Sequence, residues 1–150
     1  MQGALADLAD TAWESASEDE LLSAARDIET WTRQLYRIAL DVTAELDTRG
    51  VAASRGATST AVLLRQVLRI SPGQANRRVA DARAVCPRVH ITGEISEPVL
   101  PVAAAALAEG AICEEHLRVI RRTVQDLPPH TTPDMQAAVE SRLVADAADL

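Results

Sequence analysis

Residues 17–50 read SEDELLSAARDIETWTRQLYRIALDVTAELDTRG, and the architecture of the chain is organised around them. Ser17 and Glu20 have the spacing of a capping box, in which each side chain satisfies a free backbone N–H at the start of a helix. Apolar residues then recur at intervals of three and four, as one face of an α-helix requires. They are Leu21, Ala24, Ala25, Ile28, Trp31, Leu35, Ile38, Val42 and Leu46. Because Gly50 is a suitable left-handed cap, we predict a helix over 18–48, roughly 45 Å long.

A helix of this length serves either as a structural spine or as half of a dimer seam. The second alternative predicts a homodimer through the 18–48 helix. Composition supports a helical fold in general, because the apolar residues are mainly Ala, Leu and Val, and aromatic residues make up only 2% of the chain. Ala, Leu and Arg are strong helix formers. We therefore predict an all-α fold, a multi-helix bundle with one long N-terminal helix.

Two shorter helices are predicted in the middle of the chain. Thr58 or Ser59 is placed to cap a helix at about 60–69. The run Ser71-Pro72-Gly73-Gln74 is a restart signal for a second helix at about 72–85, since Ser and Gln form a second capping box and proline suits the first helical position. In that second helix Ala75, Val79, Ala82 and Cys86 form a narrow apolar stripe, and Gln74, Arg77 and Asp81 are predicted to project from the opposite side.

The positive charge is concentrated in the same region. Residues 49–88 contain eight arginines and a single acid, whereas the chain as a whole has a formal net charge of −7. The arginines are Arg49, Arg55, Arg65, Arg69, Arg77, Arg78, Arg83 and Arg88. Such segregation creates a local positive field and indicates an anionic partner.

The two middle helices are typical of a helix-turn-helix, in which the second helix lies in the major groove of DNA. Arginine suits guanine and phosphate, and Asn or Gln suits adenine. The predicted contacts to double-stranded DNA are Arg65, Arg69, Gln74, Asn76, Arg77, Arg78 and Arg83. This hypothesis requires the arginines to face outward as one continuous surface. Two alternatives stay open: a helical hairpin with a solvated basic face, and a helical dimerisation or protein-interaction module whose arginines pair with the acidic segments.

The remaining segments complete the predicted domain. Residues 88–98 are an irregular connector or a short hairpin at Gly93, and helices follow at about 99–109 and 114–126. Thr132 and Pro133 start a last helix towards the C-terminus. Residues 1–16 form a tail or a short helix over 3–13, and residues 17–150 form the helical domain. Because the chain stops inside an amphipathic pattern, we interpret it as a fragment truncated at its C-terminus.

The sequence contains no pattern that predicts a catalytic, metal or cofactor site. Cys86 and Cys113 are single and far apart, so they do not supply the paired ligands of a zinc knuckle, and buried thiols are favoured over a disulfide. A Gly-rich phosphate loop and a Ser–His–Asp arrangement are absent. We therefore expect no cofactor and no small-molecule ligand. No apolar run reaches the roughly 18 residues of a membrane span, and without a signal-peptide pattern the expected location is the cytoplasm.

The order of these segments resembles the domain of unknown function 222 family, also called the 13E12 repeat family. The matching stretches are ELDTRG (45–50), GATSTAVLLRQVLRISPGQANRRVADARAV (56–85), ITGEISEPVLPVAAAALAEGAI (91–112), EEHLRVIRR (114–122) and the Leu-Pro pair at 127–128. Together they extend over about residues 18–150.

The resemblance implies an all-helical region that precedes a C-terminal HNH endonuclease domain. An HNH site needs a general-base histidine, a metal-binding histidine and an asparagine close together. Here His90, His116 and His130 are isolated and Asn76 is the only asparagine. No catalytic residue is therefore carried over, and we expect this chain itself not to be an enzyme.

Overall fold

The computed structural model describes residues 13–89 and 93–149 and confirms the all-α class. In chain order the elements are η1 (Trp13–Ser15), α2 (Glu18–Thr48), α3 (Val51–Ser54), α4 (Thr60–Leu68), α5 (Pro72–Val85), β1 (Arg88–Val89), β2 (Ile95–Ser96), α6 (Pro101–Glu109), α7 (Glu114–Gln125) and α8 (Pro133–Ala148). The short helix predicted over residues 3–13 lies outside the described residues except for Trp13.

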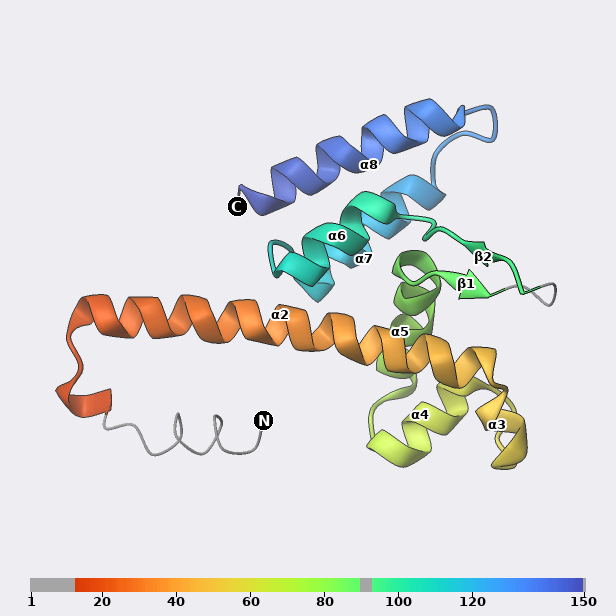
Figure 1. Ribbon diagram of the computed structural model, residues 1–150, viewed down its shortest axis with the longest axis horizontal. Helices are drawn as coiled ribbons and strands as arrows, with labels where there is room; N and C mark the ends of the chain where they lie inside the picture. Colours follow the sequence, from red (N-terminus) through yellow and green to blue (C-terminus); the bar gives the residue numbers. More distant parts are fainter. Residues whose placement is uncertain (1–12, 90–92, 150) are drawn as a thin grey trace.

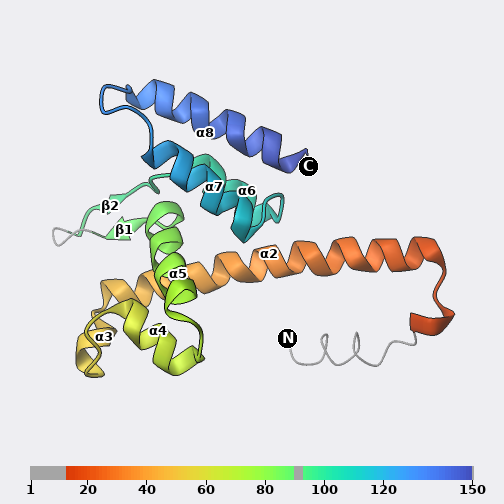
Figure 2. The ribbon, with the colours of Figure 1, turned by 180° about the vertical axis from the view of Figure 1, so that it is seen from behind.

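Helix α2 is the axis of the molecule (Figure 1). Helices α6, α7 and α8 are stacked on one side of it, α3 and α4 lie on the other side near its C-terminal end, and α5 crosses it between the two groups. The view from behind shows the same arrangement (Figure 2). None of the helices in residues 13–89 and 93–149 is both long and apolar enough to cross a bilayer.

The helix starts that local sequence predicts are confirmed. Ser17 and Glu20 form the capping box of α2, and Ser71 and Gln74 form that of α5 with Pro72 in its first turn. Thr132 caps α8 by accepting a hydrogen bond from the backbone N–H of Met135. Each of these contacts joins residues three positions apart, which is why the sequence alone predicts them.

The main core lies between α2, the C-terminal end of α5, and the α6–α8 group. Its fully buried members include Leu40, Val85, Leu107, Leu117 and Ile120. A smaller cluster joins α4 to α5. Burial of these apolar groups is the dominant favourable contribution to folding.

The apolar stripe predicted on α2 does not face this core. Buried Leu40 and Thr43 and half-buried Tyr36 and Ala44 form the core-facing side instead. Most of the large stripe residues, including Leu35, are exposed. The main core contacts α2 only along the segment that α5 and α6 cross, so only the side of that segment that faces them is buried in it.

A buried carboxylate from α8 caps the start of α6. Leu100 at the N-cap of α6 makes no side-chain capping bond, and Pro101 has no N–H. Glu140, 2% exposed, accepts a hydrogen bond from the N–H of Ala103 at 2.8 Å and another from Val102. Burial raises the pKa of Glu140, and these backbone hydrogen bonds oppose that effect. Long-range capping of this kind leaves no local sequence signal.

Of the two forms left open for residues 88–98, the structure contains the hairpin. Arg88 pairs with Ser96, and Val89 pairs with Ile95, in an antiparallel register. The ladder is two residues long on each strand, so it connects α5 to α6 without adding a sheet layer.

Candidate nucleic-acid interface

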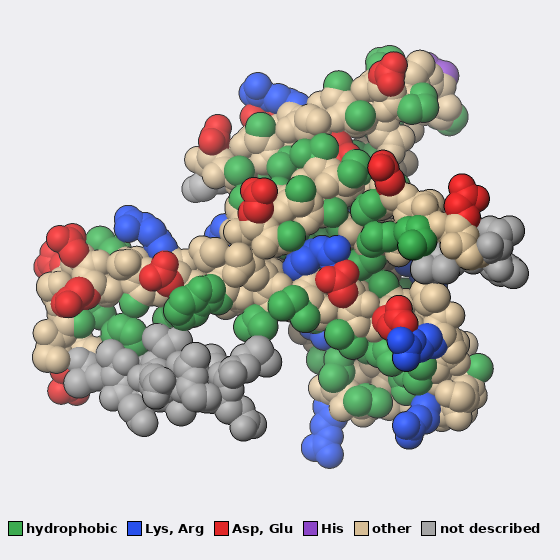
Figure 3. All heavy atoms as spheres, viewed as in Figure 1, with side chains coloured by type: hydrophobic (Ala, Val, Ile, Leu, Met, Phe, Trp, Pro, Cys, Tyr) green, Lys and Arg blue, Asp and Glu red, His purple; other side chains and the backbone are tan. Residues whose placement is uncertain are grey.

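Residues 49–80 form a basic lobe at the C-terminal end of α2. This segment contains six arginines and neither Asp nor Glu, whereas the rest of the chain contains nine arginines and 22 acids. It comprises α3, α4, the following turn and the first two thirds of α5. Figure 3 shows basic side chains projecting from the end of the molecule that α3 and α4 form. Because the segment has no carboxylate of its own, its arginines can pair only with acids outside it, as Arg49 does with Glu45 of α2.

The turn between α4 and α5 has an unusual backbone conformation. Arg69, the C-cap of α4, has φ 55° and ψ 35°, and it is the only non-glycine residue with positive φ in the described part of the chain. Ser71 then caps α5. Left-handed backbone disfavours residues with a Cβ and is usually occupied by Gly or Asn. An exposed arginine at this position is a deviation that stability alone does not explain.

The helices on either side of this turn pack against each other through Leu64, Ala75 and Val79. This contact orients the start of α5 relative to α4. Four of the seven predicted DNA contacts are exposed here, and they are Arg65, Arg69, Gln74 and Asn76. The structure therefore brings these four to one lobe of the molecule.

Arg55, exposed at the end of α3, belongs to the same lobe and was not among the predicted contacts. Arg55, Arg65 and Arg69 form no ion pair with any carboxylate in residues 13–89 and 93–149. The sequence signal that points to Arg55 is the uninterrupted absence of acids between Asp47 and Asp81.

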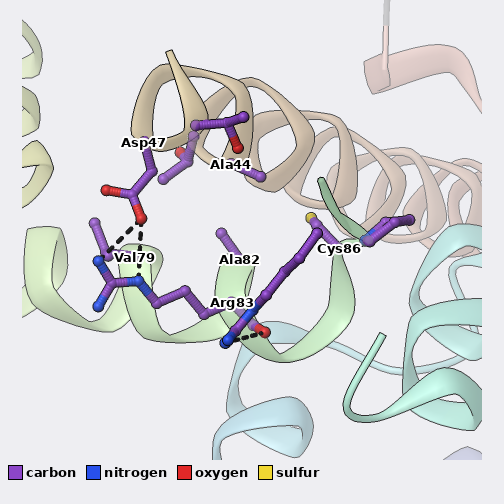
Figure 4. Close-up of a pocket in the computed structure, with 10 residues that line it drawn as sticks. Ala44, Asp47, Val79, Ala82, Arg83 and Cys86 are labelled. Atoms are coloured by element: carbon purple, nitrogen blue, oxygen red, sulfur yellow. Dashed lines mark hydrogen bonds and ion pairs between the residues drawn. The ribbon is translucent and has the colours of Figure 1, made fainter. Parts of the chain in front are cut away.

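Arg83, another predicted contact, is bound to α2. Its Nε and Nη2 donate to Oδ2 of Asp47 at 3.1 and 2.9 Å, and the Thr60 hydroxyl donates to Oδ1 of the same carboxylate at 2.5 Å. Partial burial opposes ionisation of Asp47, but the hydrogen bonds from Thr60 and Arg83 outweigh it and hold the pKa of this carboxyl below its usual value. Figure 4 shows the pair at the edge of a cleft between α2 and α5. The charge of Arg83 is thus neutralised within the fold.

Arg77 and Arg78 are also partly buried. Both are half-buried, and the guanidinium carbon of Arg78 lies 5.9 Å from the ring centroid of Tyr36. The Nε atom of Arg77 is buried and has no hydrogen-bond partner in the described part of the chain. The predicted arginines therefore do not form the one continuous outward surface that the sequence hypothesis required, so that hypothesis fails for the full set and only the exposed arginines of the basic lobe stay candidates. They divide into an exposed group on the basic lobe and a second group engaged with α2 and its neighbours.

The prediction that Asp81 projects outward is wrong. Asp81 is fully buried, accepts a hydrogen bond from the Tyr36 hydroxyl at 2.9 Å and is ion-paired to Nε of Arg121 at 2.9 Å. Burial raises the pKa of Asp81, against the opposing effects of Tyr36 and Arg121. Burial, and then the charge of Asp81, raises the pKa of Tyr36. At Asp81 the side of α5 opposite its apolar stripe meets Tyr36 of α2 and Arg121 of α7, whereas Gln74 on the same side is exposed, and the periodicity of α5 cannot indicate this difference.

The cleft between α2 and α5 contains one of the two cysteines of the chain. The cleft in Figure 4 has a volume of about 380 Å³, and Cys86 at its wall is buried, with a thiol pKa raised to about 11 mainly by burial. This thiol is therefore protonated at neutral pH and unsuited to nucleophilic attack. Cys86 and Cys113 are both free, and the described residues contain no group of three or more His, Cys, Asp or Glu side chains able to hold a metal.

Comparison with known proteins identifies the family of the chain and assigns no activity to it. The model of a domain of unknown function, DUF222, matches residues 22–150. Uncharacterized protein Mb1614c of Mycobacterium bovis and Uncharacterized protein Rv3466 of Mycobacterium tuberculosis are each 32% identical over 114 residues, which are 76% of this chain and 51% of each relative. Uncharacterized protein Mb1179c of M. bovis is 36% identical over 76 residues, 51% of this chain and 17% of that protein. The chain thus spans about half the length of the first two relatives and a smaller share of the third. No solved structure matches.

Proposed function

This chain belongs to the DUF222 family, and we propose that it is a non-catalytic module that binds and positions double-stranded DNA for an HNH endonuclease-like parent protein. The observation that carries the proposal is the basic lobe, where exposed Arg55, Arg65 and Arg69 pair with no carboxylate among the described residues 13–89 and 93–149. Arginines without a partner carboxylate retain their charge for an external anion, and the DNA backbone presents one charge about every 1.7 Å.

The proposal divides the lobe between two kinds of contact. Arg55, Arg65 and Arg69 contact phosphates and fix the position of the protein on the duplex, as backbone contacts generally do. Asn76 and Gln74, exposed in the first two turns of α5, reach base edges in the major groove; since Oε1 of Gln74 accepts the N–H of Ser71, Gln74 offers its Nε2 donor. Arg83 and Asp81 in the C-terminal half of α5 are bound to Asp47 of α2 and Arg121 of α7, and Ala75 in its first half packs on α4, so the exposed start of α5 is presented on a packed support.

The acidic remainder of the chain supports a defined orientation. Outside the lobe the chain has 22 acids against nine arginines, so the remainder carries a net negative charge that disfavours contact with the phosphate backbone. DNA is therefore attracted to one end of the molecule, beyond the C-terminus of α2.

Titration of a labelled duplex of about 30 base pairs, followed by fluorescence anisotropy between 50 and 200 mM NaCl, tests the proposal. Three phosphate contacts predict a slope of log affinity against log salt near −3, since each contact contributes about −0.9. The double variant Arg55→Gln/Arg65→Gln is expected to reduce the slope to about −1.

The matched control is Arg122→Gln/Arg142→Gln, which removes the same charge from exposed sites on α7 and α8. This control should keep the slope of the unmodified chain. Equal effects of both double variants contradict a localised site. Absence of salt-sensitive binding up to about 100 µM protein supports the alternative, a helical interaction module without DNA contact.

A further inference from the structure

The exposed face of α2 carries a heptad repeat. Position a is occupied by Leu21, Ile28, Leu35 and Val42, and position d by Ala24, Trp31 and Ile38. The six larger side chains are 41–57% exposed. We call these seven residues the seam stripe. A spacing of 3.5 residues sustained over three heptads is the pattern by which one helix packs along another in a coiled coil.

The core of the domain does not use this stripe. In the same heptad numbering, fully buried Leu40 occupies position f and buried Thr43 occupies position b, on the side opposite a and d. Packing on α5 and α6 therefore explains the residues at b, c and f. It gives no reason for a regular row of large apolar side chains on the outer side of the helix.

The exposed area of the stripe fits a two-copy interface. Its six large side chains expose on the order of 600 Å² per copy, so two copies would bury about 1,200 Å², the lower end of the range for specific interfaces. An exposed apolar patch of this size typically marks an interaction site. A heptad stripe is complementary to another heptad stripe, which makes a second copy of α2 its simplest partner.

We propose that α2 pairs with α2 of a second copy through the seam stripe, as a parallel two-stranded coiled coil. The flanking charges select the orientation. Asp27 and Asp41 occupy g positions. Antiparallel pairing would place Asp27 of one copy beside Asp41 of the other. Parallel pairing places them beside e-position residues, Thr32 and Leu46, and avoids like charges.

The seam ends before Glu45, the next d position. The carboxylate of Glu45 is ion-paired with Arg49 of the same helix, so it is directed along its own chain. Parallel pairing would place the two basic lobes at the same end of the dimer. The pairing does not rest on DNA binding. A dimer that does not bind DNA would contradict the proposed function and leave the pairing through the seam stripe intact.

Sedimentation equilibrium of the chain under reducing conditions, from about 1 to 100 µM, tests the pairing against Leu35→Lys and its control Leu22→Lys. Both leucines are exposed on α2, at 45% and 55%, but Leu22 lies at position b, outside the stripe. We expect concentration-dependent dimers of the unmodified chain and of Leu22→Lys, and monomers of Leu35→Lys with unchanged helical circular dichroism. A monomeric unmodified chain overturns the proposal. The stripe would then be the contact site of another segment or of another protein. Equal loss of dimer in both variants also overturns the proposal.

Disulfide trapping tests the orientation. In a parallel pair each a position faces itself, so Ile28→Cys and Leu35→Cys should each cross-link under mild oxidation, and the unmodified chain should not. In an antiparallel pair Leu35 faces Trp31 of the second copy, and neither single variant would cross-link. Dimers that resist both cross-links therefore overturn the parallel arrangement.

Discussion

Arg83 of α5 donates two hydrogen bonds to one oxygen of Asp47 on α2, across 36 residues of sequence. The side chains are 57% and 31% exposed, so the pair contributes little to stability, but it neutralises a charge that the sequence assigns to DNA. The basic stretch is thereby separated into an exposed lobe and an internally paired group. This separation leads to the first prediction.

Removing the Asp47–Arg83 pair is expected to leave DNA binding unchanged. The variant Asp47→Asn/Arg83→Gln conserves net charge, whereas Arg65→Gln removes a charge from the lobe. Anisotropy titrations should show the unmodified salt slope for the first and a slope smaller by about 1 for the second. A reduced slope in the double variant would mean that Arg83 leaves Asp47 to contact phosphate.

Arg69→Gly is expected to change stability and DNA affinity in opposite directions. Glycine relieves the cost of left-handed backbone, so the free energy of unfolding should rise by about 0.5–1 kcal/mol in urea titrations. The loss of one guanidinium should weaken duplex binding and reduce the salt slope by about 1. A gain in stability with unchanged binding would place Arg69 outside the interface.

Asp81→Ala is expected to destabilise the fold strongly. It leaves Arg121, whose side chain is 16% exposed, without its buried partner, at a cost of about 3 kcal/mol. Asp126→Ala, which breaks the exposed pair with Arg122, should cost less than about 0.5 kcal/mol. Chemical unfolding compares the two variants, and similar losses would show that the Asp81 network has no special structural role.

Gly110→Ala is expected to disturb the packing of α6 on α2. A Cβ at Gly110 would lie 2.8 Å from Cγ2 and 3.0 Å from the carbonyl oxygen of Thr30, at a φ of 77°. Strain and contact together predict a loss of about 2–4 kcal/mol. Gly56→Ala, at φ 70° with no atom within 4 Å, should lose only about 1–2 kcal/mol. Thermal unfolding measures the difference, and equal losses would exclude the Thr30 contact as its cause.

The contribution of Asp47 to stability is expected to depend on pH. Its folded pKa lies below the usual 3.8, so its stabilising effect is present above about pH 4 and is lost as the pH falls through the lower value. Asp47→Asn should therefore be less stable than the unmodified chain at pH 7, by at most about 1 kcal/mol because the pair is partly exposed. The two unfolding free energies should converge once the pH falls below the folded pKa of Asp47. A difference that persists there would mean that the carboxylate charge is not responsible.

Where each helix begins could be predicted from the sequence, because capping is local. Ser17 with Glu20, Ser71 with Gln74, and Thr132 each act within one helical turn, and the structure places the helix starts beside them. The four-residue helix α3 carries no such cap and was missed. The exposed half of the candidate interface was also predictable, since Arg65 and Arg69 lie in a segment without acids.

The orientation of the other site residues required the assembled fold. By sequence Asp81 and Arg77 are predicted to face solvent on a helix with one narrow apolar stripe, but Asp81 is enclosed by Tyr36 of α2 and by Arg121 of α7, which lies 40 residues away along the chain. Likewise the periodicity of α2 left open whether its apolar stripe meets the core or a second copy, and the structure places Leu40 and Thr43, not the stripe, in the core.

The sequence by itself determined the all-α class, the long N-terminal helix, the capped helix pair and the concentration of arginine, because propensity, capping and charge depend on neighbours within a few positions. Only the tertiary structure decided which arginines keep their charge and which side of α2 meets the core. Those outcomes depend on contacts between helices that are distant in sequence. There, burial and ion pairing distinguish side chains that have similar local sequence surroundings.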